Sequence, residues 1–428
     1  MTQFKVSPSS LKGTIVIPPS KSHTLRAILF GLMGKGKTYV RNYLNSPDTF
    51  AMVDAVRMFG SSAEMNNEEI IINGTGGKLQ STENVIDSGN SGQVLRFIGA
   101  LAGLSPTYTV ITGDHSIRHN RPVKPLLNAL SQLGAMADSM RQDGYAPILI
   151  KGPMKPGRVT LPGEDSQPVS GILIATSFLN GKSEIFVDNP GEKPWIDLTL
   201  SWMKRLGLRV DNDNYTHYTV HGNGSYDGFD ISVPGDFSSA AFPIAAAIVT
   251  DSELTLGNID MDDCQGDKKL IEVLIAMGAN IEIDAEKKQL KIKKGSKLKG
   301  MELDINDYID AITILAVIGC YTEGTTRIVN AAVARKKESD RIHSICTELK
   351  KMGASIEETP DGLIVSRSSL HGAQLKSYAD HRIAMSLSIA ALGAKGESVI
   401  DGVECVAKTF PTFARDLSNL GASIEVRQ

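Results

Sequence analysis

The sequence of 428 residues is poor in cysteine, and its four cysteines lie far apart without a C-x-x-C pair. This spacing excludes a disulfide framework and a zinc knuckle, and it fits a reducing compartment, so we expect a cytoplasmic protein. An excess of charge of one sign is also missing, because the formal net charge is only -3. A small net charge excludes the global basic field that would make nucleic acid the default partner. Any binding site for anions must therefore be local.

Long hydrophobic runs are missing as well. Residues 1–6 lack the apolar core of a signal peptide. The longest apolar stretches, near 240–249 and 311–320, reach only about half the length of a membrane-spanning helix. We therefore expect a protein with no membrane partner and no cleaved leader, and we expect a monomer.

Two series of residues recur along the chain and indicate six copies of one unit. Short polar residues precede apolar runs at intervals of 68 to 76 positions, and glycines recur in step at intervals of 68 to 75. Because short polar residues cap helix N-termini and glycine ends helices, each copy is predicted to contain two helices. The predicted helix starts are Ser22, Asn90, Ser166, Ser238, Asp310 and Asp380, and the predicted helix ends are Gly60, Gly134, Gly207, Gly278, Gly353 and Gly421.

Helix and strand patterns alternate within each copy, which predicts an α/β fold. Residues 126–133 are amphipathic, whereas residues 94–104 are apolar nearly all round and are expected to be buried. Residues 279–283 alternate in polarity, as a half-exposed strand does. The sequence therefore predicts two similar domains, each of three repeated α/β units with buried helices and peripheral sheets.

Two proline-containing breaks place the predicted domain boundary. Pro18-Pro19 precedes the first polar-capped helix, and Pro234-Gly235 interrupts the pattern between the third and fourth copies. We expect a first domain at residues 20–235 and a second at 236–428, which residues 1–19 join. The chain is then expected to cross between the domains twice.

One motif match is rejected on its context. Residues 31–38 satisfy the G-x-x-x-x-G-K-[ST] pattern of a phosphate-binding loop. That loop requires a strand before it and a helix after it, so that backbone N–H groups point at the phosphates. Here residues 22–33 are predicted to be helical and residues 38–40 to form a strand. A glycine-rich turn with solvated lysines is the preferred interpretation.

Basic residues gather at or beside the repeated helix starts, and each of them alone is a weak signal. Residues at equivalent positions of several copies can converge on one space, which would bind a strongly anionic ligand through charge-assisted contacts. Asp310 and Glu338 are the acids that we place among these cations, and either can serve as general base or acid. His115 and His119 lie beside arginines that would repel a metal ion, so no metal is expected. The cations are Lys21, Arg121, Lys337, Arg341, Arg382 and Lys408.

These residues lie in motifs that resemble the 5-enolpyruvylshikimate-3-phosphate synthases, a family of enolpyruvyl transferases, over essentially the whole length. The motifs are Pro-Ser-Lys-Ser-x-x-x-Arg at 19–26, Gly-Asn-Ser-Gly at 89–92, Arg-Pro at 121–122, Lys-Glu-Ser-Asp-Arg at 337–341, Asp-His-Arg at 380–382 and Lys-Thr-Phe-Pro at 408–411. The resemblance implies an inside-out α/β barrel in each domain, an active site in the cleft between the domains, and closure over the substrates. It implies enolpyruvyl transfer from phosphoenolpyruvate to the 5-hydroxyl of shikimate 3-phosphate, in chorismate and aromatic amino-acid biosynthesis, without a cofactor.

The resemblance also implies which residues bind each substrate. Asp310 is assigned to the 5-hydroxyl and Glu338 to the enolpyruvyl methylene as hypotheses, with Lys21 assisting either proton transfer. The residues implied for phosphoenolpyruvate are Lys21, Asn90, Gly92, Arg121, Gln167, Arg341, Arg382 and Lys408. Those implied for shikimate 3-phosphate are Lys21, Ser22, Arg26, Ser166, Gln167, Asp310 and Lys337.

Three positions depart from the commoner family pattern, and two alternative functions stay open. Asp165 stands where a serine often precedes Ser166, and Glu192 and Trp195 occupy a Ser-x-Pro-Tyr segment of the shikimate pocket. The first alternative is the sister transferase that acts on UDP-N-acetylglucosamine, which carries Lys-Asn where residues 21–22 are Lys-Ser. The second is a non-catalytic anion-binding scaffold, which has little reason to keep two acids among its cations.

Overall fold

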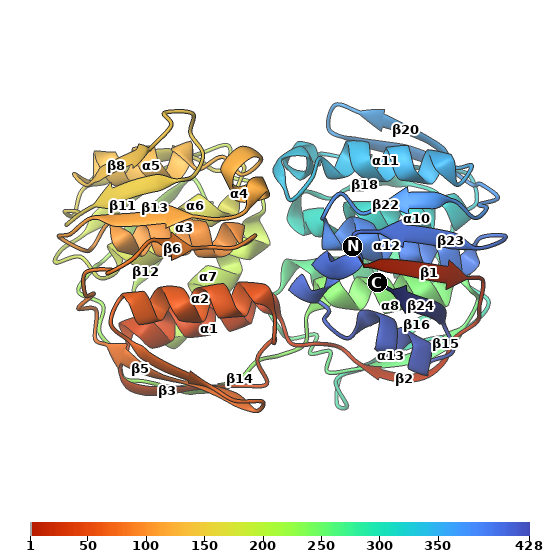
Figure 1. Cartoon of the computed structure of the whole chain (residues 1–428), viewed down its shortest axis with the longest axis horizontal. Helices are drawn as coiled ribbons and strands as arrows, with labels where there is room; N and C mark the ends of the chain where they lie inside the picture. The colour runs from red at the N-terminus through yellow and green to blue at the C-terminus, as the bar shows by residue number, and fades with distance from the viewer. Residues whose placement is uncertain (1) are drawn as a thin grey trace. The chain divides into compact units, whose positions relative to one another are not determined.

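The computed structural model describes residues 2–428, which form two compact units (Figure 1). Pro19–Val233 make up one unit, which we call the inserted unit. The other, the terminal unit, consists of the chain up to Pro18 together with Pro234–Gln428. The chain therefore passes from the terminal unit into the inserted unit and back again.

The inserted unit contains three four-stranded sheets that share one topology. In each sheet the first two strands are parallel, and the third and fourth strands add antiparallel pairs. In spatial order the sheets are β14 (Asp230–Ser232), β3 (Lys35–Arg41), β5 (Glu69–Thr75) and β4 (Ser62–Met65); β6 (Ile86–Asp87), β7 (Thr109–Thr112), β9 (Ile148–Lys151) and β8 (Met136–Ser139); and β10 (Arg158–Pro162), β11 (Ser183–Asp188), β13 (His217–Val220) and β12 (Val210–Asp213).

The terminal unit repeats this topology in three further sheets. The N-terminal strand β1 (Gln3–Ser7) pairs on both sides with strands from the end of the chain, and Figure 1 shows it as a red arrow among blue ones. In spatial order the sheets are β2 (Lys12–Val16), β15 (Glu253–Gly257), β17 (Gln289–Ile292) and β16 (Ile281–Asp284); β18 (Glu302–Asp304), β19 (Thr325–Val329), β21 (Gly362–Ser366) and β20 (Ser355–Thr359); and β22 (Gln374–Lys376), β23 (Ser398–Asp401), β1 (Gln3–Ser7) and β24 (Ser423–Arg427).

Two strands explain why the chain crosses between the units twice. Strand β2 precedes the first helix in the sequence but pairs in parallel with β15 of the terminal unit, with Ile15 opposite Leu256. Strand β14 precedes the fourth copy but pairs in parallel with β3 of the inserted unit, with Ile231 opposite Val40. Each crossing thus leaves its preceding strand in the unit that the chain is leaving, and all six sheets are completed.

Six apolar helices form the inner layer of the units, three in each, as the sequence predicts. Every residue of α3 (Gly92–Ala102) is buried. Within a unit these helices pack on one another, as α3 packs on α6 and α12 on α8. They are short, and among residues 2–428 no helix combines the length and the apolar character needed to span a membrane. The inner helices are α1 (Lys21–Met33), α3 (Gly92–Ala102), α6 (Ser166–Thr176), α8 (Phe237–Val249), α10 (Ile312–Tyr321) and α12 (His381–Gly393).

The second helix of each copy is amphipathic and ends at the predicted glycine. All six glycines have positive φ, from +73° at Gly207 to +110° at Gly278. Positive φ costs glycine little because it lacks Cβ, so these residues end the helices in the left-handed conformation. These helices are α2 (Pro47–Met58), α5 (Lys124–Gln132), α7 (Lys193–Arg205), α9 (Lys269–Met277), α11 (Arg341–Lys351) and α13 (Phe413–Asn419).

The inner helices begin at the predicted intervals along the chain, but the residue predicted to cap each helix is mostly wrong. Asp380 alone among the six predicted residues caps its helix, by accepting a hydrogen bond from Arg382 N. Ser22, Ser166 and Ser238 lie inside the first turn, and the caps of those helices stand one or two residues earlier. Runs of several short polar residues reveal that a helix begins but not which of them caps it. The observed side-chain caps of α1, α3, α6 and α8 are Ser20, Ser91, Asp165 and Asp236.

The glycine-rich segment at residues 31–38 has the context that the sequence predicts. Helix α1 ends at Met33, and strand β3 begins at Lys35. The order is helix, turn and strand, so the amides of the turn do not open a helix that could face phosphates. The context that argues against a phosphate-binding loop is confirmed, but the predicted turn is only Gly34, because residues 35–38 already belong to β3.

Candidate active site

A cluster of charged side chains in the terminal unit is centred on Arg341, the first residue of α11. The guanidinium is 2% exposed and is surrounded by three carboxylates. Its Nε donates to Asp380 Oδ2 at 2.8 Å, Nη1 to Asp310 Oδ1 at 2.7 Å and Nη2 to Glu338 Oε2 at 2.6 Å. Burial by itself would lower the pKa of Arg341, but the three carboxylates outweigh that effect and raise it above its ordinary value. Arg341 therefore stays a cation.

Two further cations connect the carboxylates of this cluster. Arg382 Nη2 donates to Asp310 Oδ2 at 2.8 Å, and Lys408 Nζ donates to Glu338 Oε1 at 2.8 Å. Asp310 and Glu338 thus each bridge two cations. Burial would raise the pKa of Asp310, but Arg382, Arg341 and Lys337 together lower it well below its usual range. In this state Asp310 is ionised and is a weak base.

Short helical turns hold these groups. Asp310 lies in the 3₁₀ helix η2 (Asn306–Ala311), which leads directly into α10. Lys337 follows η3 (Ala332–Lys336), and Lys408 ends η4 (Val403–Lys408). The sequence predicts that Asp310 caps α10, and this prediction is wrong. The side chain of Asp310 pairs with two arginines, and no described side chain caps α10.

The inserted unit holds a second cluster around the start of α1. Lys21 Nζ lies 3.6 Å from Asp48 Oδ2. Arg26, one turn after Ser22, is buried and donates to Thr199 Oγ1 from Nε at 3.1 Å and from Nη2 at 2.9 Å. Its Nη1 donates to Ser22 O at 3.2 Å. Arg26 is thus fixed by hydroxyl and carbonyl oxygens.

The starts of α3 and α6 extend this cluster. Arg96 Nη1 donates to Gln167 Oε1 at 3.0 Å. A Cβ added to Gly92 would lie 2.7 Å from Arg96 Nη1, 2.8 Å from Arg121 Nη1 and 3.2 Å from Gln167 Oε1. A side chain at position 92 would therefore have to displace the guanidinium groups that approach the helix start. Asn90 lies beside them and donates from Nδ2 to Asp114 Oδ2 at 2.5 Å.

Two carboxylates cover the start of α6. Glu192 Oε2 accepts hydrogen bonds from both N and Oγ of Ser166, each at 3.0 Å. Asp165 Oδ1 accepts from Gln167 N at 3.0 Å, and its Oδ2 lies 3.0 Å from Arg96 Nη2. The sequence flagged both acids as departures from the family pattern, and both contact residues that are predicted to bind substrate.

Comparison with known proteins agrees with this geometry. The sequence model of the EPSP synthase family (3-phosphoshikimate 1-carboxyvinyltransferase) matches residues 6–417. The chain belongs to the EPSP synthase family. It is 43% identical over 423 residues to the 3-phosphoshikimate 1-carboxyvinyltransferase of Ruminiclostridium cellulolyticum, with 99% of each chain covered. It is 42% identical to the protein of that name from Acetivibrio thermocellus, with 98% of this chain and 99% of the other covered.

Solved structures place the fold within the same family. An EPSP synthase from Acinetobacter baumannii superposes with a TM-score of 0.83 at 31% identity, with all of both chains covered. The enolpyruvyl transferase NikO from Streptomyces tendae has the same fold, with a TM-score of 0.80 at 16% identity over 100% of this chain and 99% of that one. The predicted α/β fold of the enolpyruvyl transferase type is confirmed.

The predicted site residues fall into two groups, one in each unit of this EPSP synthase family member. The structure brings Asp310, Glu338, Arg341, Arg382 and Lys408 together through direct ion pairs in the terminal unit. In the inserted unit it gathers Gly92, Arg121 and Gln167 around Arg96, while the other predicted residues there lie at or just before the starts of α1, α3 and α6: Lys21, Ser22, Arg26, Asn90 and Ser166.

Several residues of these clusters were not predicted as site residues. Asp48 Oδ2 accepts a hydrogen bond from Ser91 Oγ at 2.9 Å and also lies near Lys21 Nζ. Thr199 Oγ1 accepts hydrogen bonds from Arg26. Asp380 was identified as a helix start but not as a partner of Arg341. The sequence carried only one relevant signal, an apolar neighbourhood around a short acid or hydroxyl residue. A hydroxyl on α7 has no motif that links it to α1.

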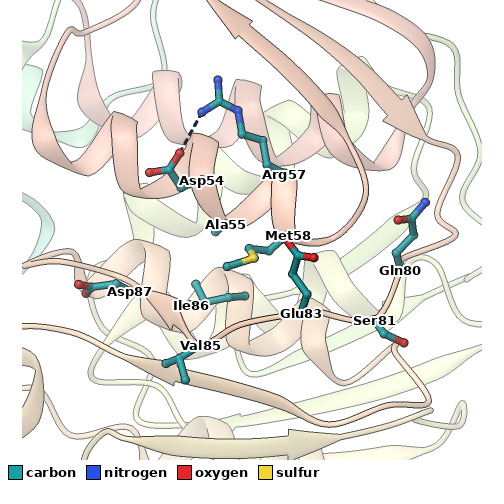
Figure 2. A pocket seen from close by; sticks show the side chains of 10 residues that line it. All are labelled: Asp54, Ala55, Arg57, Met58, Gln80, Ser81, Glu83, Val85, Ile86 and Asp87. Atoms are coloured by element: carbon teal, nitrogen blue, oxygen red, sulfur yellow. Dashed lines mark hydrogen bonds and ion pairs between the residues drawn. The ribbon is translucent and has the colours of Figure 1, made fainter.

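The structure also contains a surface pocket of about 560 Å³ on the inserted unit, and none of the predicted site residues lines it (Figure 2). It is lined by residues of α2 and of the segment that leads into β6. Figure 2 shows Asp54 paired with Arg57 at 3.0 Å on its rim, with Met58 and Ile86 pointing inward. The predicted site residues lie in other segments, so this pocket is not part of the candidate active site.

Proposed function

We propose that this chain transfers the enolpyruvyl group of phosphoenolpyruvate to the 5-hydroxyl of shikimate 3-phosphate and releases phosphate, a step of chorismate and aromatic amino-acid biosynthesis. Membership of the EPSP synthase family supports the reaction. The observation that carries it is the placement of Asp310 and Glu338, each of which bridges two cations. A site built only to bind anions gains nothing from two carboxylates among its cations.

The cations of both clusters would hold phosphoenolpyruvate, which carries a phosphate and a carboxylate. Arginine forms bidentate hydrogen bonds with both groups, and lysine contributes a point charge. We propose that the two clusters serve one reaction. The residues proposed for phosphoenolpyruvate are Lys21, Asn90, Gly92, Arg121, Gln167, Arg341, Arg382 and Lys408.

The acceptor substrate would be held mainly by the inserted unit. Ser22, Ser166 and Gln167 offer hydroxyl and amide groups at helix starts, where the partial positive charge of the helix favours an anion. Arg26 and Lys337 add charge for the phosphate, and Asp310 would accept a hydrogen bond from the 5-hydroxyl. The residues proposed for shikimate 3-phosphate are Lys21, Ser22, Arg26, Ser166, Gln167, Asp310 and Lys337.

The reaction needs two proton transfers in the addition step. Asp310 takes the proton of the 5-hydroxyl while the hydroxyl oxygen bonds to the central carbon of phosphoenolpyruvate. Glu338 delivers a proton to the methylene carbon. The tetrahedral adduct then loses a methyl proton, the double bond re-forms, and the C–O bond to phosphate breaks. Lys21 can assist either transfer. The cations stabilise charge on the adduct and the departing phosphate.

The ion pairs of the cluster suggest how Asp310 becomes active. Arg341, Arg382 and Lys408 each pair with a carboxylate in the structure. Anionic substrate that takes over these cations would weaken their hold on Asp310 and so raise its pKa from the depressed value. Asp310 would then be a stronger base.

Two broader properties accompany the proposed function. The four cysteines are free, as the sequence predicts, and a reducing environment such as the cytoplasm suits them. UDP-N-acetylglucosamine is not favoured as acceptor, because the family model and the curated relatives carry the shikimate enzyme's name. The monomeric state stays a prediction.

The test is phosphate release by the purified chain in the presence of phosphoenolpyruvate and shikimate 3-phosphate, with UDP-N-acetylglucosamine as the competing acceptor. We expect release only with shikimate 3-phosphate, accompanied by an equal amount of the enolpyruvyl product. Release with the UDP-sugar alone would overturn the acceptor assignment. No release with either acceptor would favour a scaffold that binds anions without chemistry.

A further inference from the structure

Glu192 is a buried carboxylate that the proposed chemistry does not use. It is 1% exposed and stands directly before α7. Its backbone is left-handed, with φ +47° and ψ +38°, a conformation that few residues other than glycine adopt. A buried charge in an unfavourable backbone conformation requires strong local partners.

Glu192 has partners on Ser166, a residue that the proposed function gives to the acceptor. Glu192 Oε2 accepts from the main-chain N–H and from the hydroxyl of Ser166, each at 3.0 Å. The main-chain N–H of the next residue, Gln167, donates to Asp165 Oδ1. Ser166 and Gln167 are two of the residues proposed for shikimate 3-phosphate. In the structure their main-chain donors therefore already face carboxylates.

A phosphate and a carboxylate compete for such donors. Each N–H or O–H group points its single hydrogen at one acceptor, so Ser166 cannot bond fully to both anions. Two anions at one helix start also repel each other, and the low local dielectric strengthens that repulsion. The phosphate can bond to Ser166 only after the carboxylate of Glu192 has moved away.

The neighbourhood of Glu192 links it to another residue of the acceptor set. Helix α7 begins at Lys193, and Arg26 Nη2 donates to Trp195 O at 3.3 Å and to Thr199 Oγ1 at 2.9 Å. The start of α7 thus carries both the competing carboxylate and the oxygens that fix Arg26. A movement of Glu192 would therefore take place at the start of α7, which also contacts Arg26, a residue proposed to bind the phosphate.

We propose that Glu192 determines the affinity for the phosphorylated acceptor by occupying Ser166 until the phosphate displaces it. The inference rests on the proposed function, because it assumes that Ser166 receives the acceptor's phosphate. The opposite role is that of a permanent second cap for α6, in which Glu192 stays on Ser166 throughout the reaction.

The first experiment compares steady-state kinetics of wild type and Glu192→Gln with both substrates varied. The amide keeps the shape and a hydrogen-bond acceptor but removes the charge, so we expect the KM for shikimate 3-phosphate to fall about tenfold or more, the order of one charged hydrogen bond. The KM for phosphoenolpyruvate and kcat should change less than about threefold, because neither depends on the competition. Inorganic phosphate should inhibit the variant at lower concentration than wild type.

Glu164→Gln is the matched control, since it removes an exposed negative charge two residues before Ser166. A fall of equal size in both variants would assign the effect to general charge and overturn the proposal. An unchanged or higher KM for shikimate 3-phosphate in Glu192→Gln would also overturn it. The comparison requires that the wild-type protein turns over both substrates. If it does not, the proposed function is wrong, and the competition at Ser166 has not been measured.

A second measurement does not depend on the variant folding. A crystal structure of the wild-type protein with shikimate 3-phosphate should show Ser166 bonded to the phosphate and Glu192 moved off Ser166. A phosphate bonded elsewhere, with Glu192 still on Ser166 N and Oγ, would establish the permanent cap. A phosphate on Ser166 beside an unmoved Glu192 would contradict the competition directly.

Discussion

The two charged clusters of this chain hold their arginines in different ways. In the terminal unit, Arg341 is enclosed by three carboxylates within 2.8 Å. In the inserted unit, Arg26 is fixed by the hydroxyl of Thr199 and by main-chain oxygens. A cation among carboxylates is part of a charge network in which each member depends on the others. Hydrogen bonds to hydroxyl and main-chain oxygens fix the position of a guanidinium without placing a carboxylate on each of its nitrogens.

This difference suggests a division of labour between the units. Acids that transfer protons need neighbouring cations to set their pKa, and the terminal unit supplies that environment to Asp310. Phosphate recognition needs hydrogen-bond donors at fixed positions, and the inserted unit holds Arg26 and the helix starts in place. We therefore assign the proton transfers to the terminal unit and most of the acceptor binding to the inserted unit.

The largest expected effect tests this division directly. Glu338→Gln and Asp310→Asn should each lower kcat by about 10² to 10⁴, the usual contribution of general acid-base catalysis, while both substrates still bind. Glu358→Gln is the control, because Glu358 lies in the same unit and pairs with Arg335 at 3.2 Å outside the cluster. Rapid-quench turnover and isothermal titration measure the two quantities. Near-normal turnover of either variant would remove that residue from the mechanism.

The next effect concerns stability and separates the two kinds of arginine. Arg341→Met leaves three carboxylates, of which Glu338 and Asp380 are buried, without their shared cation, which should cost about 3 to 5 kcal/mol of unfolding free energy. Arg26→Met leaves neutral oxygens behind, so its cost should be closer to about 1 to 3 kcal/mol. Urea unfolding of both variants measures the difference. Equal losses would show that the carboxylates add nothing to the cost of removing the cation.

The sequence predicted the spacing of the six repeats better than the residue at which each helix begins. Gly60 and the five glycines that follow it were recognisable because a left-handed helix end strongly favours glycine. The cap of α1 was misplaced because Ser20 and Ser22 are chemically alike, and only the backbone distinguishes them. Strand β1 could be predicted as a strand, but its place between β23 and β24 is a long-range pairing that local pattern does not encode.

The candidate site shows the same limit. Motif residues such as Arg341 and Lys408 were identifiable, and resemblance assigned their roles. The partners that hold them were not, because Asp380 and Thr199 reach their arginines across 39 and 173 positions of the sequence. Pairings at such distances depend on packing between repeats, which a single sequence does not reveal.

A smaller effect should appear in the pH dependence of stability. The pKa of Asp310 is lowered in the folded protein, so its contribution is complete above its unfolded pKa, about 4. It is lost as the pH falls from there toward the folded pKa, and its size is on the order of 2 kcal/mol. Wild type should therefore exceed Asp310→Asn in stability at pH 7, and the gap should narrow below about pH 4. A gap that is constant from pH 7 to pH 3 would contradict ionic stabilisation by Asp310.

The smallest effect compares the helix-ending glycines of the two units. Gly134 of the inserted unit has φ +90° and, among the described residues, no atom within 4 Å of an added Cβ. Gly134→Ala should therefore cost only the strain of a left-handed alanine, about 1 kcal/mol, which lowers Tm by roughly 2 to 4 °C for a unit of this size. Gly278 of the terminal unit has φ +110°, and a Cβ there would lie 2.5 Å from Lys297 O.

Gly278→Ala must therefore displace backbone as well as adopt a strained conformation, and its Tm should fall further than that of Gly134→Ala. Gly257→Ala is the control, since its φ is not positive and an added Cβ meets its nearest neighbour only at 3.8 Å. Scanning calorimetry of the three variants gives the order. If Gly134→Ala and Gly278→Ala lower Tm equally, the chain near Lys297 yields to the new side chain. The helix ends of the two units would then be equivalent in energy, and the contrast between the units would be confined to their charged clusters.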